Sequence, residues 1–315
     1  MERAGREVHG RKPPGGKFEV TELTMQLVAG ELTDPLLAGE VAVQGDVQFK
    51  VTAGTSVDGN SRQMLAGAFD VAEMSFATYL KAREQGRDLI GLPIFTGRGF
   101  LQPGLLVSTA SGITRPEDIT GRRVGVPQFW MTSSVWHRGI LLQQHGVKAE
   151  AVEWYTASEE RFEGITFPAG VKINRLAEGI QPNAALEQGL VDVVMVPPRG
   201  ARGPMRPGTR SAYADLPEAQ RTYFAKTGVF PIMHFVVMRE SVHRKLPWLA
   251  AALQTAFLES KARAEKAGAV PPPIANEKWE FGLTENARAL DTFVGFAREQ
   301  GWVSDKLTLA DCFVA

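Results

Sequence analysis

Residues 121–139 read as a short strand, a tight turn and the start of a helix. Val124–Val126 is an apolar run that Pro127 ends, because proline has no N–H to give to a sheet. Thr132–Ser134 follow where a helix would begin, and hydroxyl side chains cap free N–H groups there. Such N–H groups and the helix dipole also attract anions. The stretch therefore predicts either an ordinary capped helix or a carboxylate site, and spacing alone does not decide between them.

Strands and helices alternate along most of the chain. Phe69–Ser75 reads as a strand that leads directly into a helix over Phe76–Gln85. Phe230–Met238 is a strong apolar strand, and the sequence after it carries apolar residues at helical spacing. This alternation is typical of an α/β protein with largely parallel sheets.

The order of the elements indicates two lobes. The strand at Leu105–Ser108 precedes a self-contained α/β unit, after which the chain returns to the first part of the molecule. Two crossings of this kind predict a hinge with a cleft between discontinuous lobes, and ligands bind at the carboxyl ends of strands in such sheets. We expect lobe 1 to comprise 18–107 plus 231–315, and lobe 2 to comprise 108–230.

Charge and composition exclude some classes of partner. Lys plus Arg and Asp plus Glu both number 35 among 315 residues, so the chain lacks the basic excess of nucleic-acid or membrane-surface proteins. Residues 1–17 read as a flexible polar leader, with no apolar run of a signal peptide, and no stretch could span a bilayer. We therefore expect a cytoplasmic protein that contacts neither nucleic acid nor membrane. Cys312 is the single cysteine, so no intrachain disulfide forms.

A set of collinear motifs points to a known family. Each is weak alone, but they occur in one order from about residue 18 to the C-terminus: 69–75 (FDVAEMS), 93–98 (PIFTGR), 113–118 (ITRPED), 121–128 (GRRVGVPQ), 131–132 (MT), 136–139 (WHRG) and 230–234 (FPIMH). Together they resemble the 4,5-dihydroxyphthalate decarboxylase family, which is similar to type 2 periplasmic binding proteins. The resemblance implies a two-lobed type 2 periplasmic-binding-protein-like α/β fold with a hinge and an inter-lobe cleft.

One segment departs from the family pattern. Members usually carry a basic or histidine-containing run after the arginine that corresponds to Arg98. Here that run is 99–103 (GFLQP), in which Gln102 is neutral. If the segment touches substrate, the preferred substrate differs from that of the family.

Cofactor-free decarboxylation of an aromatic acid needs a proton donor at the ring carbon, and cationic or N–H contacts for carboxylates. His234 and Glu73 are the best acid–base candidates, although a histidine in an apolar strand is as often a satisfied core residue. Arg98 suits bidentate binding of a carboxylate or, alternatively, braces the lobes. Thr132 and Ser133 are candidates to hold a second carboxylate at the helix start.

Further candidates are assigned to substrate binding. Ser75 and Gln128 are hydrogen-bonding positioners, and Trp130 precedes the helix where it could stack on an aromatic ring or simply pack. Arg138 lies on the helix and is a candidate for substrate contact or a supporting salt bridge. Arg199 begins a basic loop that either closes over an acidic ligand or stays solvated.

Other chemistries find no support in the sequence. The histidines form no metal-binding pattern, and neither a glycine-rich phosphate loop nor a Gly-x-Ser-x-Gly elbow is present. We therefore expect no metal and no cofactor.

Two functions remain open. The first is a cofactor-independent decarboxylase of a hydroxylated aromatic carboxylic acid such as a dihydroxyphthalate. The second is a non-catalytic binding protein, either a transport receptor or a cytoplasmic sensor. The expected partner is a small aromatic carboxylate in either case, and the chain length allows a homodimer.

Overall fold

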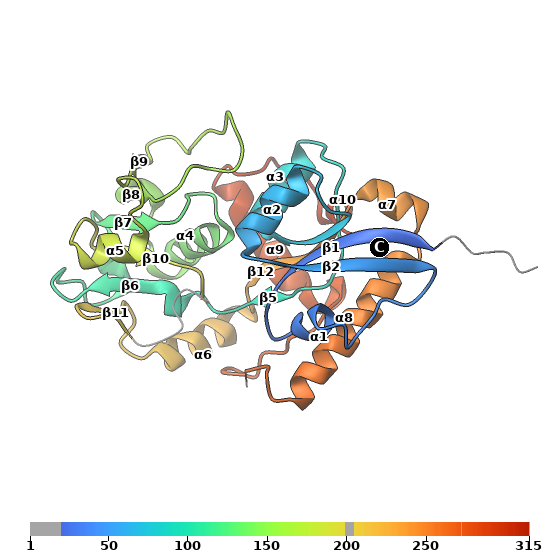
Figure 1. Cartoon of the computed structure of the whole chain (residues 1–315). Coiled ribbons are helices and arrows are strands. Elements are labelled where there is room, and N and C mark those ends of the chain that lie inside the picture. The colour runs from blue at the N-terminus through green and yellow to red at the C-terminus, as the bar shows by residue number, and fades with distance from the viewer. Residues whose placement is uncertain (1–19, 199–204, 272, 315) are drawn as a thin grey trace, which may run out of the picture.

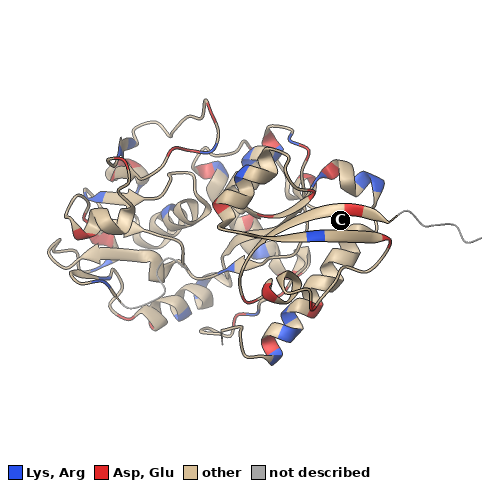
Figure 2. Cartoon of the chain, viewed as in Figure 1, with Lys and Arg blue, Asp and Glu red and all other residues tan. Residues whose placement is uncertain are grey.

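The strands of the described residues form two sheets, which lie side by side in Figure 1. The computed structural model describes residues 20–198, 205–271 and 273–314, and the predicted leader over 1–17 lies outside them. Positive and negative side chains are interspersed over both halves of the molecule (Figure 2), in keeping with their equal numbers. None of the described helices is long and apolar enough to cross a membrane.

The first sheet has the strand order β2-β1-β3-β12-β4, and β5 also pairs with β12. Its strands are β1 (Thr21–Val28), β2 (Val47–Gly54), β3 (Val71–Ser75), β4 (Ile90–Gly91), β5 (Gly97–Arg98) and β12 (Ile232–Met238). Alternation along β1 turns Leu23, Met25 and Leu27 into the core. Every residue of β3 is buried, as expected of a central strand.

The second sheet has the strand order β11-β6-β10-β7-β8-β9. Its strands are β6 (Leu105–Ser108), β7 (Arg123–Val126), β8 (Glu153–Thr156), β9 (Lys172–Arg175), β10 (Val193–Met195) and β11 (Thr209–Ser211). Strand β7 and the helix that begins at Thr132 confirm the strand–turn–helix prediction for residues 121–139.

Helices cover both sheets. Those that follow strands of the first sheet are α1 (Asp34–Leu37), α2 (Val57–Leu65), α3 (Phe76–Glu84), α7 (Glu240–Lys245) and α8 (Leu249–Lys266). The second sheet carries α4 (Thr132–His145), α5 (Pro182–Glu187) and α6 (Leu216–Thr227). The chain ends with α9 (Leu283–Glu299) and α10 (Leu309–Cys312). The alternation of strands and helices confirms the predicted α/β class.

The sheets are parallel except where the chain crosses between them. Pairs β1–β2, β1–β3, β7–β8 and β8–β9 are parallel, whereas β12 runs antiparallel to β3 because it returns from the second sheet.

The chain passes from the first sheet to the second earlier than predicted. Strand β6 pairs with β10 and β11, so the chain has entered the second sheet by Leu105 and not after residue 107. The assignment of the remaining residues to lobes stays a prediction.

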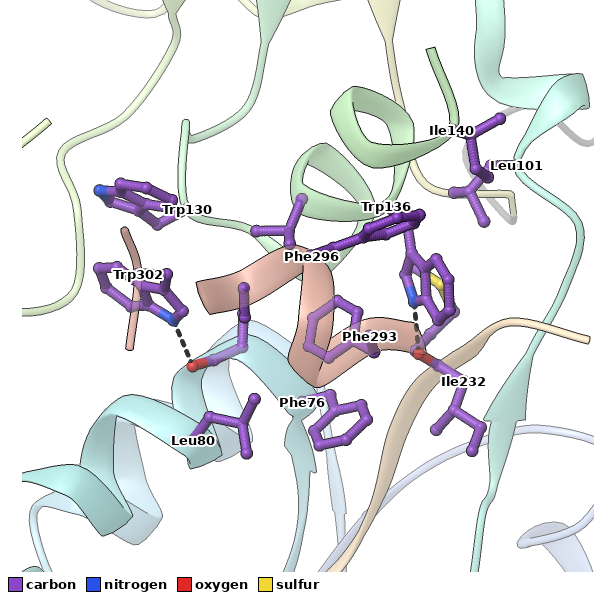
Figure 3. Packing of buried hydrophobic residues seen from close by; sticks show 14 of the residues in the cluster. Phe76, Leu80, Leu101, Trp130, Trp136, Ile140, Ile232, Phe293, Phe296 and Trp302 are labelled. Atoms are coloured by element: carbon purple, nitrogen blue, oxygen red, sulfur yellow. Dashed lines mark hydrogen bonds between the residues drawn. The ribbon is translucent and has the colours of Figure 1, made fainter. Parts of the chain in front are cut away.

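An apolar contact joins the two halves. Trp136 of α4 packs against Phe293 and Phe296 of α9, with ring centroids 5.2 and 5.6 Å apart. Its indole N–H donates to the carbonyl of Ile232 on β12 at 2.9 Å (Figure 3). Both halves therefore contribute to one continuous buried cluster, which fixes the position of α4 relative to the first sheet.

Gly139 makes this close approach of α4 and α9 possible. A Cβ atom at this glycine would lie 2.2 Å from the ring of the buried Phe296. We expect Gly139→Ala to lower the free energy of unfolding by about 1–3 kcal/mol, because the two helices must separate to admit the methyl group. Urea denaturation followed by circular dichroism measures the change.

Gly295 on α9 supplies the matched control. A Cβ atom at Gly295 meets nothing within 4 Å. Gly295→Ala is therefore expected to raise the free energy of unfolding by about 0.5–1 kcal/mol through helix propensity alone. Equal effects of the two substitutions would contradict the packing argument.

Candidate active site

The amino-terminal ends of α2, α3 and α4 converge on a cavity of about 350 Å³ between the two sheets. Residues that follow strand ends or begin helices supply most of its wall. The lining consists of Val28, Ser56, Val57, Asp58, Ser75, Gly97, Arg98, Met131, Thr132, Ser133, Arg161, Pro197, Pro198, Met233, His234 and Trp279. The predicted site residues Ser75, Arg98, Thr132, Ser133 and His234 are thus brought together.

The register of β12 against β3 brings His234 to Glu73. His234 pairs with Ser75, and Glu73 pairs with Val236, so the two side chains are diagonal neighbours on one face. The imidazole Nδ1 lies 2.5 Å from Glu73 Oε1. Thr96 Oγ1 donates to the same oxygen at 2.6 Å, and the Val28 N–H donates to Oε2 at 2.9 Å.

Glu73 is held as a carboxylate despite being only 2% exposed. Burial opposes its ionisation, but the imidazole of His234 and the donors Thr96 and Val28 outweigh burial and hold the pKa of Glu73 below its ordinary value. A carboxylate bound to Nδ1 sets the orientation of the ring and directs Nε2 away from it. Glu73 does not line the cavity itself, so it acts through His234.

Gly97 on β5 lets the backbone lie against the imidazole. A Cβ atom there would stand 2.0 Å from both Cε1 and Nε2 of His234. Glycine is therefore required at this position by the close approach of the ring. His234 is therefore held between β5 and Glu73 at the wall of the cavity.

Arg98 carries a partly buried guanidinium group into the cavity. It donates from Nη1 to Asn286 Oδ1 at 2.6 Å and from Nη2 to the Phe230 carbonyl at 2.7 Å. Its buried Nε has no hydrogen-bond partner among the described residues, and the carboxylates of Glu280 and Glu277 favour its charged form. Burial lowers the pKa of Arg98 to about 9, so the group stays cationic at neutral pH. A cation held in this way can receive an anionic ligand group.

The hydroxyl groups at the start of α4 do not cap the helix, contrary to the prediction of ordinary capping. The Thr132 hydroxyl lies 2.8 Å from Ser75 Oγ and accepts the Ala77 N–H at 2.9 Å, so it links the two sheets. Ser134 donates to the Gln128 carbonyl at 2.8 Å. No side chain caps α4, and its first-turn N–H groups have no intrahelical partner. The helix start therefore presents donors to the cavity.

The hydroxyl of Ser133 adds a further hydrogen-bond donor at the start of α4. Its side chain is fully buried, and its hydroxyl has no hydrogen-bond partner among the described residues. Because a buried hydroxyl without a partner is costly, a ligand acceptor at this point would satisfy it.

Part of the predicted anion site is occupied by the protein itself. Glu160, from the segment after β8, accepts the N–H of Phe129 at 2.6 Å and that of Trp130 at 3.2 Å. Burial raises the pKa of Glu160, although both N–H donors and two arginines oppose that shift. The turn after β7 thus binds an internal carboxylate, and only the helix start beyond it faces the cavity.

Three predicted substrate-binding residues do not line the cavity. Gln128 is buried and donates to the Glu159 carbonyl. Trp130 stacks on Trp302 with ring centroids 4.7 Å apart. Arg138 lies over the ring of Phe129 at 3.7 Å and cannot reach the cavity from that position.

Gln128 and Trp130 precede α4 and Arg138 lies on it beyond the first turn, whereas the cavity contacts only the start of α4. Arg199 lies outside the described residues, as does the loop that it begins as far as residue 204. Gln102 is buried but lines no part of the cavity, so its neutral amide does not bear on ligand contact.

Sequence reasoning missed other groups at the cavity. Asp58 on α2 and Arg161 from the segment after β8 form an ion pair that crosses between the sheets. Ser56 begins α2 by accepting the Gly59 N–H at 3.0 Å, a capping signal that the sequence carries. Arg161 carries no such signal, because its position depends on tertiary contacts. No three His, Cys, Asp or Glu side chains of the described residues gather as metal ligands.

Comparison with known proteins places this site in a family context. No protein-family model matches the chain. It is 29% identical over 309 residues to a 4,5-dihydroxyphthalate decarboxylase of Comamonas testosteroni, covering 89% of this chain and 92% of that protein. A protein of the same name from Pseudomonas putida is 30% identical over 170 residues, which cover 52% of this chain and 65% of that protein.

The chain is thus similar to two proteins named 4,5-dihydroxyphthalate decarboxylase. The resemblance predicted from its motifs is confirmed.

Solved structures confirm the predicted fold. The periplasmic aliphatic sulphonate binding protein SsuA of Escherichia coli superposes with a TM-score of 0.52 at 15% identity, covering 91% of this chain and 87% of that chain. A Xanthomonas citri protein solved with bound ATP superposes equally well, with a TM-score of 0.52 at 12% identity, over 90% of this chain and 100% of that one. The chain thus has the two-lobed α/β fold of periplasmic binding proteins.

Acid titration tests the state of Glu73. Because its pKa lies below the ordinary value of 4.5, its charge-dependent stabilisation is complete above pH 4.5 and is lost as the pH falls through the lower folded-state pKa. We expect Glu73→Gln to cost about 1–3 kcal/mol of unfolding free energy at neutral pH, a deficit that shrinks in acid.

Urea unfolding from neutral pH to strongly acidic pH measures this deficit. Glu187→Gln, which removes a carboxylate from an exposed pair with Arg206, serves as the control and should change little. A deficit for Glu73→Gln that stays constant with pH would contradict the assignment.

Proposed function

We propose that the protein is a cofactor-independent carboxy-lyase that removes CO2 from a hydroxylated aromatic carboxylic acid bound between the two sheets. The observation that carries the proposal is the pairing of His234 with a buried Glu73 carboxylate at a cavity that also holds the cationic Arg98. The relatives named decarboxylase support the class of reaction.

Arg98 supplies the substrate anchor in this proposal. Its cationic charge attracts an approaching carboxylate, and Asn286 and Phe230 hold the guanidinium plane in place. The N–H groups and the Ser133 hydroxyl at the start of α4 offer further donors to the same cavity. The substrate ring is thereby oriented relative to the imidazole.

His234 supplies the proton. Protonation of the ring carbon that bears the leaving carboxylate forms a C–H bond with electrons supplied by the ring, assisted by its hydroxyl group. The C–C bond to the carboxylate then breaks, its electron pair restores the aromatic ring, and CO2 leaves. The neutral imidazole regains a proton from water.

Glu73 assists by balancing the charge of the imidazolium form. Its carboxylate contacts Nδ1, so Nε2 is the nitrogen available to the substrate. Thr96 and the Val28 N–H keep the carboxylate in place during proton transfer. Trp279 and Met233 complete a largely apolar wall suited to an aromatic ring.

A non-catalytic receptor is the alternative, because the same fold serves solute-binding proteins. It is the weaker proposal, since the superposition on the sulphonate-binding protein carries only 15% identity whereas the sequence relatives at 29–30% identity are named as decarboxylases. The cytoplasmic location and the homodimer stay predictions.

Product formation tests the proposal. Purified protein in the presence of a chelator is mixed with hydroxylated benzoates and phthalates while CO2 release and ultraviolet absorbance are followed. We expect turnover of at least one compound and a loss of about 100-fold or more in kcat for His234→Ala, because general acid catalysis contributes that much.

His145→Ala is the matched control, since His145 also contacts a glutamate, Glu117, but does not line the cavity. Its turnover should equal that of the unmodified protein. Saturable binding without any CO2 release would assign the protein to the receptor class.

A further inference from the structure

Arg161 reaches across the cleft from the segment between β8 and β9. Its Nε donates to Asp58 of α2, and its Nη1 donates to Thr78 Oγ1 of α3 at 2.6 Å. The preceding Glu160 is bound to the turn before α4. The segment is thus anchored to the second sheet by one residue while the next residue extends a guanidinium to the helices of the first.

The guanidinium group of Arg161 is almost fully buried, but not all of its N–H groups have a hydrogen-bond partner. The side chain of Arg161 is 5% exposed and lines the cavity together with Asp58 and Ser133. Its Nη2 has no hydrogen-bond partner among the described residues, and it is absent from the buried unpartnered atoms. That nitrogen is therefore accessible, and two of the donors of the planar fork remain free for an acceptor in the cavity.

Asp58 is a replaceable counter-ion. It is 37% exposed and also pairs with Arg62 at 3.0 Å, on the next turn of α2. If Asp58 turns away from Arg161, it keeps Arg62 and gains water, so the Asp58 carboxylate is not left uncompensated, and only the buried Arg161 then needs a new anionic partner. An anionic ligand group could then take the place of the Asp58 carboxylate.

We propose that Arg161 is a specificity-determining residue that binds a second anionic group of the substrate. In the empty cavity, the Asp58 carboxylate occupies the position that this anionic group takes in the complex. The unpartnered Ser133 hydroxyl lines the same cavity as a further donor. This inference rests on the proposed function only for the class of ligand, an aromatic acid. It predicts that a second carboxylate is recognised by a side chain distinct from Arg98.

Binding of phthalate and benzoate provides the test, because the two compounds differ by one carboxylate. Trp279 lines the cavity, so intrinsic fluorescence reports occupancy. Arg161→Ala should weaken phthalate binding by about 10- to 100-fold, the worth of a charge-assisted hydrogen bond, and change benzoate binding less than about threefold. Arg161→Lys should recover only part of the loss, since an ammonium lacks the planar fork.

The variant Asp58→Asn distinguishes two roles of Arg161, contact with the ligand and closure of the cleft. If Asp58 competes with the ligand for Arg161, this variant binds phthalate more tightly than the unmodified protein. Arg221→Gln, which removes an exposed arginine paired with Glu218 outside the cavity, should leave both affinities unchanged. Thermal unfolding of each variant verifies that it is folded.

Two results would overturn the inference. Equal losses of benzoate and phthalate binding in Arg161→Ala would make Arg161 a closing residue, and so would weaker phthalate binding in Asp58→Asn. Because Asp58→Asn gives an independent answer, misfolding of Arg161→Ala leaves the inference testable. If Arg161→Ala weakens phthalate binding more than benzoate binding but the protein releases no CO2, the proposed function alone is refuted. If the protein releases CO2 but Arg161→Ala affects both ligands equally, this inference alone is refuted.

Discussion

The antiparallel pairing of β12 with β3 is the constraint on which the rest of the site depends. It places His234 opposite Ser75 and diagonal to Glu73, so the histidine meets a carboxylate 161 residues away in sequence. The same strand accepts the indole N–H of Trp136 from the other half of the molecule. One returning strand therefore sets both the acid–base pair and the position of α4, whose start forms the opposite wall of the cavity.

Several polar groups at the cavity are buried but have no hydrogen-bond partner, which is unusual for buried polar groups. The Nε of Arg98 and the buried Ser133 hydroxyl have no hydrogen-bond partner among the described residues. Elsewhere in the same region the protein satisfies its own donors, as Glu160 does for the turn before α4. This contrast distinguishes the part of the cleft that is built for a ligand from the part that is built for stability.

The apolar contact between α4 and α9 bears on how a receptor-like fold can serve catalysis. Trp136, Phe293 and Phe296 join the two halves through a dry interface, with Gly139 allowing the close approach. Polar contacts close the cleft at the cavity itself, through Thr132 with Ser75 and through Arg161 with Asp58.

The sequence alone determined the α/β class, the strand–turn–helix over 121–139, the family resemblance and the inclusion of Arg98, Ser133 and His234 at one site. The class and the strand–turn–helix follow from short-range signals, because hydrophobic period and proline act within a few positions. The family resemblance follows from the order of the motifs along the chain, and the site residues follow from that resemblance and the chemistry it requires. Only the tertiary structure decided that Trp130 and Arg138 face the core and that Arg161 lies beside Asp58. The contacts of Trp130 with Trp302 and of Arg161 with Asp58 join residues more than a hundred positions apart, and they depend on how the chain crosses between the sheets, which no local pattern encodes.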